Sequence, residues 1–312
     1  MGHDTTDSRR SLLVWGALAI VYVVWGSTYL AIRIAIETVP PLLSGAMRFS
    51  TAALVLGAAL LLLRGWRVFR MTWKELGGAA LVGLLLLNAG NGLVAVAEQH
   101  ISSGLAALLV ASVPLWLVIF RIVARDMPQV LTLAGVLIGF GGVAVLSLTG
   151  GGSAADSTGI VIILLASMSW SAGSFLSARI PMPANPFVAS TVEMAAGGIG
   201  LALTSTVMGE HLDLGAVSGR SWAALAYLVV MGSLVAFTAY VWLLGTAPIS
   251  LVSTYAYVNP VVAVALGALV LSEPVTTSMV AAGLVIVLGV ALVVSTERRR
   301  NAPIGEKEPA SV

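Results

Sequence analysis

The chain has 312 residues, of which 58% are hydrophobic and only 10% are charged, and its mean hydropathy is +1.00. Such a composition excludes an ordinary water-soluble globular protein and indicates a protein of the lipid bilayer. The net charge of +2 carries little information, and the absence of cysteine excludes disulfides, thiolate catalysis and cysteine-ligated metals.

We predict an all-α membrane protein with ten transmembrane helices. A bilayer core of about 30 Å needs about 20 largely apolar residues per helix, and the chain repeatedly offers such runs. The first run lacks the short apolar core and small-residue cleavage site of a signal peptide, so we retain it as a span. The expected spans lie near 12–33, 42–63, 76–97, 103–123, 129–148, 158–178, 187–208, 221–244, 250–271 and 277–295.

The basic residues predict the orientation of these spans. If the amino terminus is cytoplasmic, only Arg33 and Arg220 face outward, and Arg48 lies inside the second span. The positive-inside rule then places both termini in the cytoplasm. The remaining thirteen Lys and Arg residues fall on the cytoplasmic side: Arg9, Arg10, Arg64, Arg67, Arg70, Lys74, Arg121, Arg125, Arg179, Arg298, Arg299, Arg300 and Lys307.

An internal repeat relates the two halves of the chain. A shift of 146 residues carries Pro40 onto Pro186, and STYLAIR (27–33) onto GSFLSAR (173–179). Five spans per copy is an odd number, so the second copy enters the membrane inverted, and a central cavity is expected between the copies. The predicted organisation is a cytoplasmic tail (1–11), a first repeat (12–149), an external linker (150–157), a second repeat (158–296) and a cytoplasmic basic tail (297–312).

Two prolines mark the middle of this repeat. The same shift carries Pro114 of span four onto Pro260 of span nine, and each proline frees the carbonyl four residues earlier. Irregular backbone at this depth is tolerated where neighbours cover it or where it lines a cavity. We interpret the pair as helix-breaking positions involved in gating, with simple helix kinks as the alternative.

Polar and aromatic residues at helical spacings suggest a substrate surface, because rings offer apolar area while amides and hydroxyls orient a polar group. The same residues could instead hold the helices together. The candidate substrate-binding residues are Trp25, Tyr29, Asn88, Asn91, Trp170, Ser174, Tyr240, Tyr255 and Asn259.

Two charged residues lie inside the predicted spans. Arg48 and Glu193 occupy almost equivalent repeat positions, and they form either a relay or, as we prefer, structural charges that snorkel or cap helix ends. Glu98 is expected in a solvated external turn. Gly135 and Gly139 form a small-residue face suited to packing against span ten or a second subunit.

The chain lacks the signatures of the main alternative classes. The three histidines lie outside the middle of the spans, no aspartate lies within a span, and no G-K-[ST] phosphate loop occurs. We therefore predict that the protein is not an enzyme, and that it uses no metal, cofactor or nucleotide. A small-solute channel remains an alternative.

The run WGSTYLAIRIAIETVPPLLSGAMRF (25–49), with its counterpart at 255–293, resembles the EamA-type permeases of the drug/metabolite transporter superfamily. This resemblance implies ten helices around a cavity bounded by spans 1, 3, 4, 6, 8 and 9, with spans 5 and 10 packed together. It implies a secondary transporter of the bacterial inner membrane that exports amino acids or other small metabolites by alternating access, or else a drug efflux carrier. Expected partners are the bilayer and a small solute, without nucleic acid; the oligomeric state is left open, a monomer included.

Overall fold

The computed structural model describes the backbone of residues 3–150 and 154–300, and within these ranges every regular element is a helix. The predicted linker and the predicted basic tail lie partly outside the described residues. The elements are α1 (His3–Ala35), α2 (Pro41–Arg64), η1 (Trp66–Phe69), α3 (Trp73–Gly83), η2 (Leu84–Asn91), α4 (Gly92–Ala97), α5 (Ser103–Val110), α6 (Val113–Val123), α7 (Val130–Gly150), α8 (Ala154–Ser177), α9 (Pro186–Val207), α10 (Gly219–Tyr227), η3 (Leu228–Phe237), α11 (Thr238–Thr246), α12 (Ile249–Val252), α13 (Tyr255–Leu271) and α14 (Thr277–Arg300).

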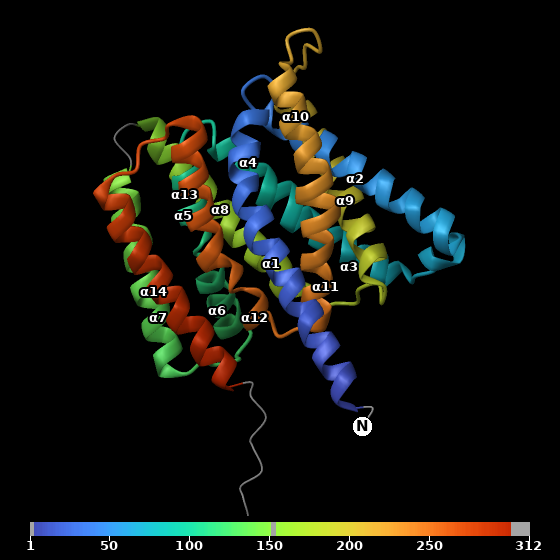
Figure 1. Cartoon of the computed structure of the whole chain (residues 1–312), viewed down its shortest axis with the longest axis horizontal. Coiled ribbons are helices and arrows are strands. Elements are labelled where there is room, and N and C mark those ends of the chain that lie inside the picture. Colours follow the sequence, from blue (N-terminus) through green and yellow to red (C-terminus); the bar gives the residue numbers. More distant parts are fainter. Residues whose placement is uncertain (1–2, 151–153, 301–312) are drawn as a thin grey trace, which may run out of the picture.

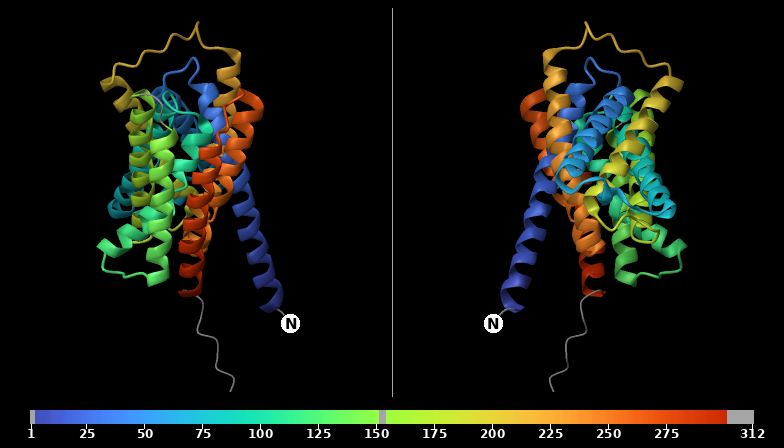
Figure 2. Two further views of the ribbon diagram at one scale, coloured as in Figure 1. Left: turned by 90° about the vertical axis from the view of Figure 1, so that its left-hand side faces the viewer. Right: turned by 90° about the vertical axis from the view of Figure 1, so that its right-hand side faces the viewer.

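These elements join into ten crossings of one bundle, as predicted. In the described part of the chain, nine helices are long and apolar enough to cross a membrane, and a shorter apolar helix (Val258–Leu271) belongs to the ninth crossing. α1 begins and α14 ends at the same end of the bundle (Figures 1 and 2). We call this the terminal end and the opposite one the distal end. The helix α1 already begins at His3, so the stretch predicted as a tail continues the first helix.

The two halves pack as an inverted repeat. α1 starts at the terminal end, whereas α8, the first helix of the second half, starts at the distal end (Figure 1). α2 packs along its equivalent α9, and α7 along its equivalent α14. α1 of the first half contacts α13 and the span from α10 to α11, while α8 makes the corresponding contacts with α5, α6 and the span from α3 to α4. Exchanging the halves therefore preserves the packing.

A pair of π-helices follows the same symmetry. η2 and η3 are wound with wider turns than an α-helix, and the 146-residue shift carries residues 84–91 onto 230–237, inside η3. This feature was not predicted, because the local sequence is apolar and reads as ordinary helix. π-Helical turns are rare and occur mostly at functional sites. Because the two π-helices occupy matched positions, we infer that a locally altered helix face is needed in both halves.

Glycines allow α7 and α14 to pack closely. A Cβ at Gly289 would overlap the backbone nitrogen of Gly139, and one at Gly135 would lie 2.9 Å from the carbonyl oxygen of Gly289. Small residues permit such backbone contact in membrane bundles. The predicted small-residue face of span five thus contacts span ten.

Replacing Gly289 by alanine is expected to destabilise the bundle, because the added methyl group overlaps the α7 backbone. Overpacking of this kind costs about 1–3 kcal/mol and should lower the thermal unfolding midpoint in detergent by several degrees. Gly141→Ala is the control, since nothing lies within 4 Å of a Cβ there. Equal midpoints for both variants would contradict the close packing.

Candidate substrate pocket

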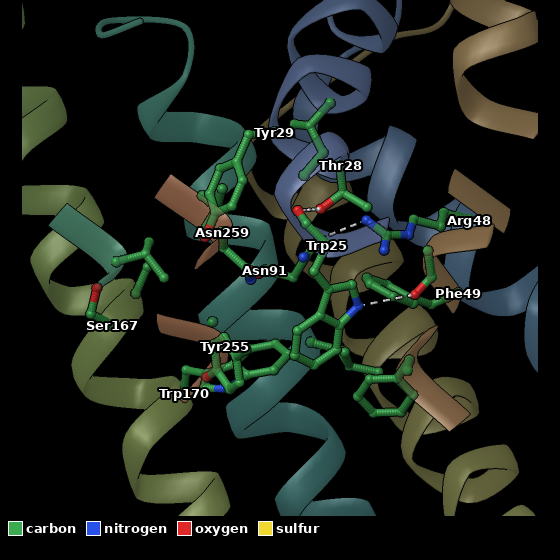
Figure 3. Close-up of a pocket in the computed structure, with 18 residues that line it drawn as sticks. Trp25, Thr28, Tyr29, Arg48, Phe49, Asn91, Ser167, Trp170, Tyr255 and Asn259 are labelled. Carbon is green, nitrogen blue, oxygen red and sulfur yellow. Dashed lines mark hydrogen bonds between the residues drawn. The ribbon is translucent and has the colours of Figure 1, made fainter. Parts of the chain in front are cut away.

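A pocket lies at the centre of the bundle, where spans from both halves meet. It contains six of the nine candidate binding residues, and it also contains Arg48. Figure 3 shows its main side chains converging from several helices. The lining residues are Trp25, Thr28, Tyr29, Ile32, Arg48, Phe49, Leu87, Gly90, Asn91, Val94, Val110, Ala166, Ser167, Trp170, Gly232, Phe237, Tyr255 and Asn259.

Four aromatic rings pack against one another at this pocket, and we call them the aromatic cluster: Trp25, Trp170, Tyr240 and Tyr255. The Trp25 ring centroid lies 4.7 Å from that of Tyr240, 5.3 Å from that of Trp170 and 5.4 Å from that of Tyr255. Trp25 packs edge-to-face with Trp170 and Tyr255 and is tilted against Tyr240, and edge-to-face packing stabilises ring pairs beyond their buried area. The cluster joins α1, α8, α11 and α13, and so links the two halves.

Neither Tyr240, a member of the aromatic cluster, nor Ser174, which lies behind it, is among the residues that line the pocket. The Tyr240 hydroxyl lies 2.7 Å from the Ser174 hydroxyl, and both side chains are buried. Ser174 also donates to the carbonyl of Trp170 at 2.9 Å. These bonds satisfy the polar atoms behind the rings and hold the ring edges in place.

The two asparagines of span three point to different places. Asn91 lines the pocket, whereas the amide oxygen of Asn88 accepts a hydrogen bond from Thr204 of α9 at 3.3 Å. Residues three apart share one face of an α-helix, but the wider turn of η2 separates them. The expectation that Asn88 shares the central cavity is therefore corrected: it lies against α9.

Asn259 supports an irregular part of the second half. With its amide nitrogen directed at the nearby acceptors, it donates to the carbonyls of Tyr22 (2.9 Å) and Tyr255 (3.2 Å). The helix of this span is interrupted at residues 253–254, just before Tyr255. The side chain thus satisfies backbone groups next to the break while it lines the pocket.

The two prolines differ in their local structure. Pro114 lies in the first turn of α6, immediately after an interruption at residues 111–112, as a helix-breaking position should. Pro260 lies inside the continuous helix α13. The prediction of a helix break at Pro260 is therefore corrected: the interruption in span nine precedes the proline.

The charged residues inside the bundle differ from their predicted roles. Arg48 is 4% exposed and lines the central pocket, so it does not snorkel to the bilayer surface. Glu193 is buried and lines a separate pocket, with Met182 and Trp242 among its neighbours. Among the described residues no ion pair joins Arg48 to Glu193. The two charges therefore do not form a contact relay.

At the distal end, carboxylates of the second half cap helices of the first. Glu210 accepts hydrogen bonds from the backbone of Leu42 (3.1 Å) and Leu43 (2.9 Å) at the start of α2. Glu273 accepts from the backbone of Ser103 (3.0 Å) and Gly104 (3.2 Å) at the start of α5. Carboxylates stabilise helix N-termini. These contacts fasten the halves together at this end.

Glu98, the first residue after the span Trp73–Ala97, is completely buried and not in a solvated turn as predicted. Arg33 reaches it, but bonds to its backbone carbonyl, and neither carboxyl oxygen has a hydrogen-bond partner. Burial raises the pKa of this carboxyl well above its usual range; the positive charge of Arg33 opposes the shift and the negative charge of Glu273 adds to it.

The orientation of η2 can be tested with single cysteines, because the chain has none. Asn91→Cys should react with a small hydrophilic thiol reagent, while Asn88→Cys and the lipid-facing Leu62→Cys should react at least about tenfold more slowly because water does not reach them. Labelling rates in membranes measure this. Equal rates at the two asparagine positions would place both on one face and contradict the π-helix.

Replacing Glu98 by glutamine should make stability less dependent on pH. A folded-state pKa above the unfolded value means that the fold accommodates the protonated form and loses stability as pH rises through this interval. The unfolding midpoint of Glu98→Gln should match wild type near about pH 4, below the unfolded pKa, and exceed it by about 2 °C or more near about pH 8. Glu37→Gln, at an exposed position, is the control: its unfolding midpoint should not diverge from that of wild type as pH rises.

Comparison with known proteins identifies the family. The model of the EamA-like transporter family matches residues 13–148 and again residues 157–295. "Uncharacterized inner membrane transporter YedA" of Escherichia coli K12 is 42% identical over 261 residues, which cover 83% of each chain. "Uncharacterized transporter YvbV" of Bacillus subtilis is 26% identical over 316 residues, 97% of this chain and 98% of that protein. A solved crystal structure with 22% identity shares the fold, with a TM-score of 0.66 over 94% of this chain and 99% of the other. This protein, with one family unit in each half, belongs to the EamA-like transporter family.

Proposed function

We propose that this protein exports small amphipathic metabolites, and amino acids in particular, across the bacterial inner membrane by alternating access. Its family makes it a transporter and not an enzyme. The observation that carries the proposal is the central pocket, which is lined by residues of both inverted halves. Two halves related in this way can rock around a site between them, so that it opens to each side in turn.

The chemistry of the lining supports an amphipathic solute. Trp25, Phe49 and Tyr255 offer apolar and ring surface, while Asn91 and Asn259 offer amide groups. Pockets of this kind bind the apolar body of a ligand by burial and orient it by a few polar contacts. A solute with one apolar and one polar part matches this arrangement better than an inorganic ion or a sugar.

The distribution of basic residues supports the proposed orientation of the chain in the membrane. Arg64 and Arg121 lie in the last turns of α2 and α6, and Arg179 follows α8; these helices run toward the terminal end. The positive-inside rule then places the terminal end, with both termini, in the cytoplasm. The relative named as an inner membrane transporter supports the same membrane for this chain.

Alanine substitutions in span nine test the proposal. Tyr255→Ala and Asn259→Ala should lower solute efflux by about tenfold or more, because each removes a contact of about 1.4 kcal/mol without reducing membrane insertion. Efflux of amino acids from cells loaded with dipeptides measures the effect, with Leu62→Ala as a lipid-facing control. Unchanged efflux at normal protein levels would remove this span from the site.

Counterflow in liposomes separates a carrier from a channel. A carrier should accumulate labelled amino acid against an excess of the unlabelled form inside, and its rate should saturate. Conduction that rises in proportion to concentration, without counterflow, would contradict alternating access.

A further inference from the structure

The inference that follows rests on the proposed function and narrows its substrate class. We infer that Arg48 binds the carboxylate of the transported solute, so that a carboxylate is a requirement for recognition.

Arg48 presents its charge to the centre of the protein. The residue belongs to α2, is 4% exposed and lines the central pocket. Figure 3 shows its side chain extending toward Thr28 and Asn91, on the same side of the pocket as Trp25. A guanidinium at this depth is costly unless it is paired or hydrated.

The partners of this guanidinium are neutral and few. Its Nε donates to the hydroxyl of Ser233 at 2.8 Å, and a terminal nitrogen donates to the amide oxygen of Asn91 at 3.4 Å. The guanidinium carbon lies 4.6 Å from the centroid of the Phe49 ring. An arginine has five N–H donors, so these bonds leave most of them unused. In the described part of the chain no carboxylate lies within ion-pair distance.

A glycine opposite Arg48 makes room for the charged end. A Cβ at Gly232 would lie 2.7 Å from a terminal nitrogen of Arg48. Gly232 lies in η3, and its carbonyl accepts a hydrogen bond from the Trp25 indole at 3.3 Å. The π-helix therefore orients Ser233 toward the arginine and leaves space beside the guanidinium. Such positioning is typical of a binding group whose rotamer is fixed in advance.

The unused donors define the chemistry of the ligand. A planar guanidinium matches a carboxylate through two parallel hydrogen bonds, and the missing counter-ion would arrive with the solute. The adjoining rings of Trp25 and Tyr255 suit an apolar body. Among the described residues that line the pocket none is acidic, so an ammonium group would depend on ring faces and amide oxygens. Organic cations without a carboxylate should therefore bind poorly beside Arg48.

Benzoate and benzamide provide a minimal pair of probes, because they share one ring and differ in charge. We expect benzoate to raise the unfolding midpoint of the purified protein and to quench its tryptophan fluorescence, with benzamide binding at least about tenfold more weakly. Arg48→Gln should weaken benzoate binding by about tenfold or more, and should remove the preference over benzamide. Arg48→Lys should retain part of it, because the charge remains but the paired donors are lost.

Two further variants control this experiment. Gly232→Ala should also weaken benzoate binding, because it displaces the guanidinium while keeping the charge. Arg220→Gln removes an exposed arginine at the distal end and should bind benzoate like wild type. If Arg48→Gln fails to fold, the lysine and alanine variants still test the site.

The outcomes separate the two proposals. Equal binding of benzoate and benzamide, or benzoate binding unchanged in Arg48→Lys and Gly232→Ala, would overturn the role of Arg48. Amino-acid counterflow that is insensitive to these variants would overturn it as well, and would leave the proposed function standing. Benzoate binding that depends on Arg48, without counterflow of any amino acid, would support the carboxylate site and contradict the proposed transport of amino acids.

Discussion

The bilayer offers no water to backbone N–H and C=O groups, and the structure depends on this constraint. Every crossing must satisfy its backbone within a helix, so departures from α-helical geometry are tolerated only where protein covers them. Here the departures are the π-helices η2 and η3 and the interruptions at residues 111–112 and 253–254. η2, η3 and the residues beside the interruptions contribute to the lining of the central pocket. The irregular backbone is thus concentrated where the two halves meet.

This concentration explains the composition of the pocket. η2 supplies Asn91 and η3 supplies Phe237, and these two positions are related by the 146-residue shift. The wider turn of each π-helix alters which residues face inward, and it places Gly232 and Ser233 beside Arg48. Each half has a π-helix at the same position, but the two π-helices carry different side chains. The pocket is therefore symmetric in architecture and asymmetric in chemistry, which supports the proposal of a solute with two unlike ends.

The buried charged residues lie at different depths in the bundle. Arg48 occupies the centre, while Glu98 lies at the distal end and Glu193 lies in a pocket beside the start of α9. At the distal end Glu210 and Glu273 cap helices of the opposite half, whereas the carboxyl group of Glu98 is buried without a hydrogen-bond partner. An alternating-access cycle that opens the distal end would have to break the caps and hydrate Glu98.

Hydropathy, charge and the proline register determined the number of spans and the inverted repeat, because helices in a bilayer have a set length and alternate in direction. Six of the nine candidate binding residues read from the sequence line the pocket. The same pattern could not determine the phase of η2, since LLLLNAGN (84–91) is equally compatible with an α-helix and a π-helix. The position of Asn88 against α9, the continuous helix through Pro260 and the burial of Glu98 all depend on neighbours far away in the sequence. The role of Arg48 is the clearest case. Its place in span two was evident from the sequence, but only the packing of η3 against α2 decided that its charge faces the central pocket and not the bilayer surface.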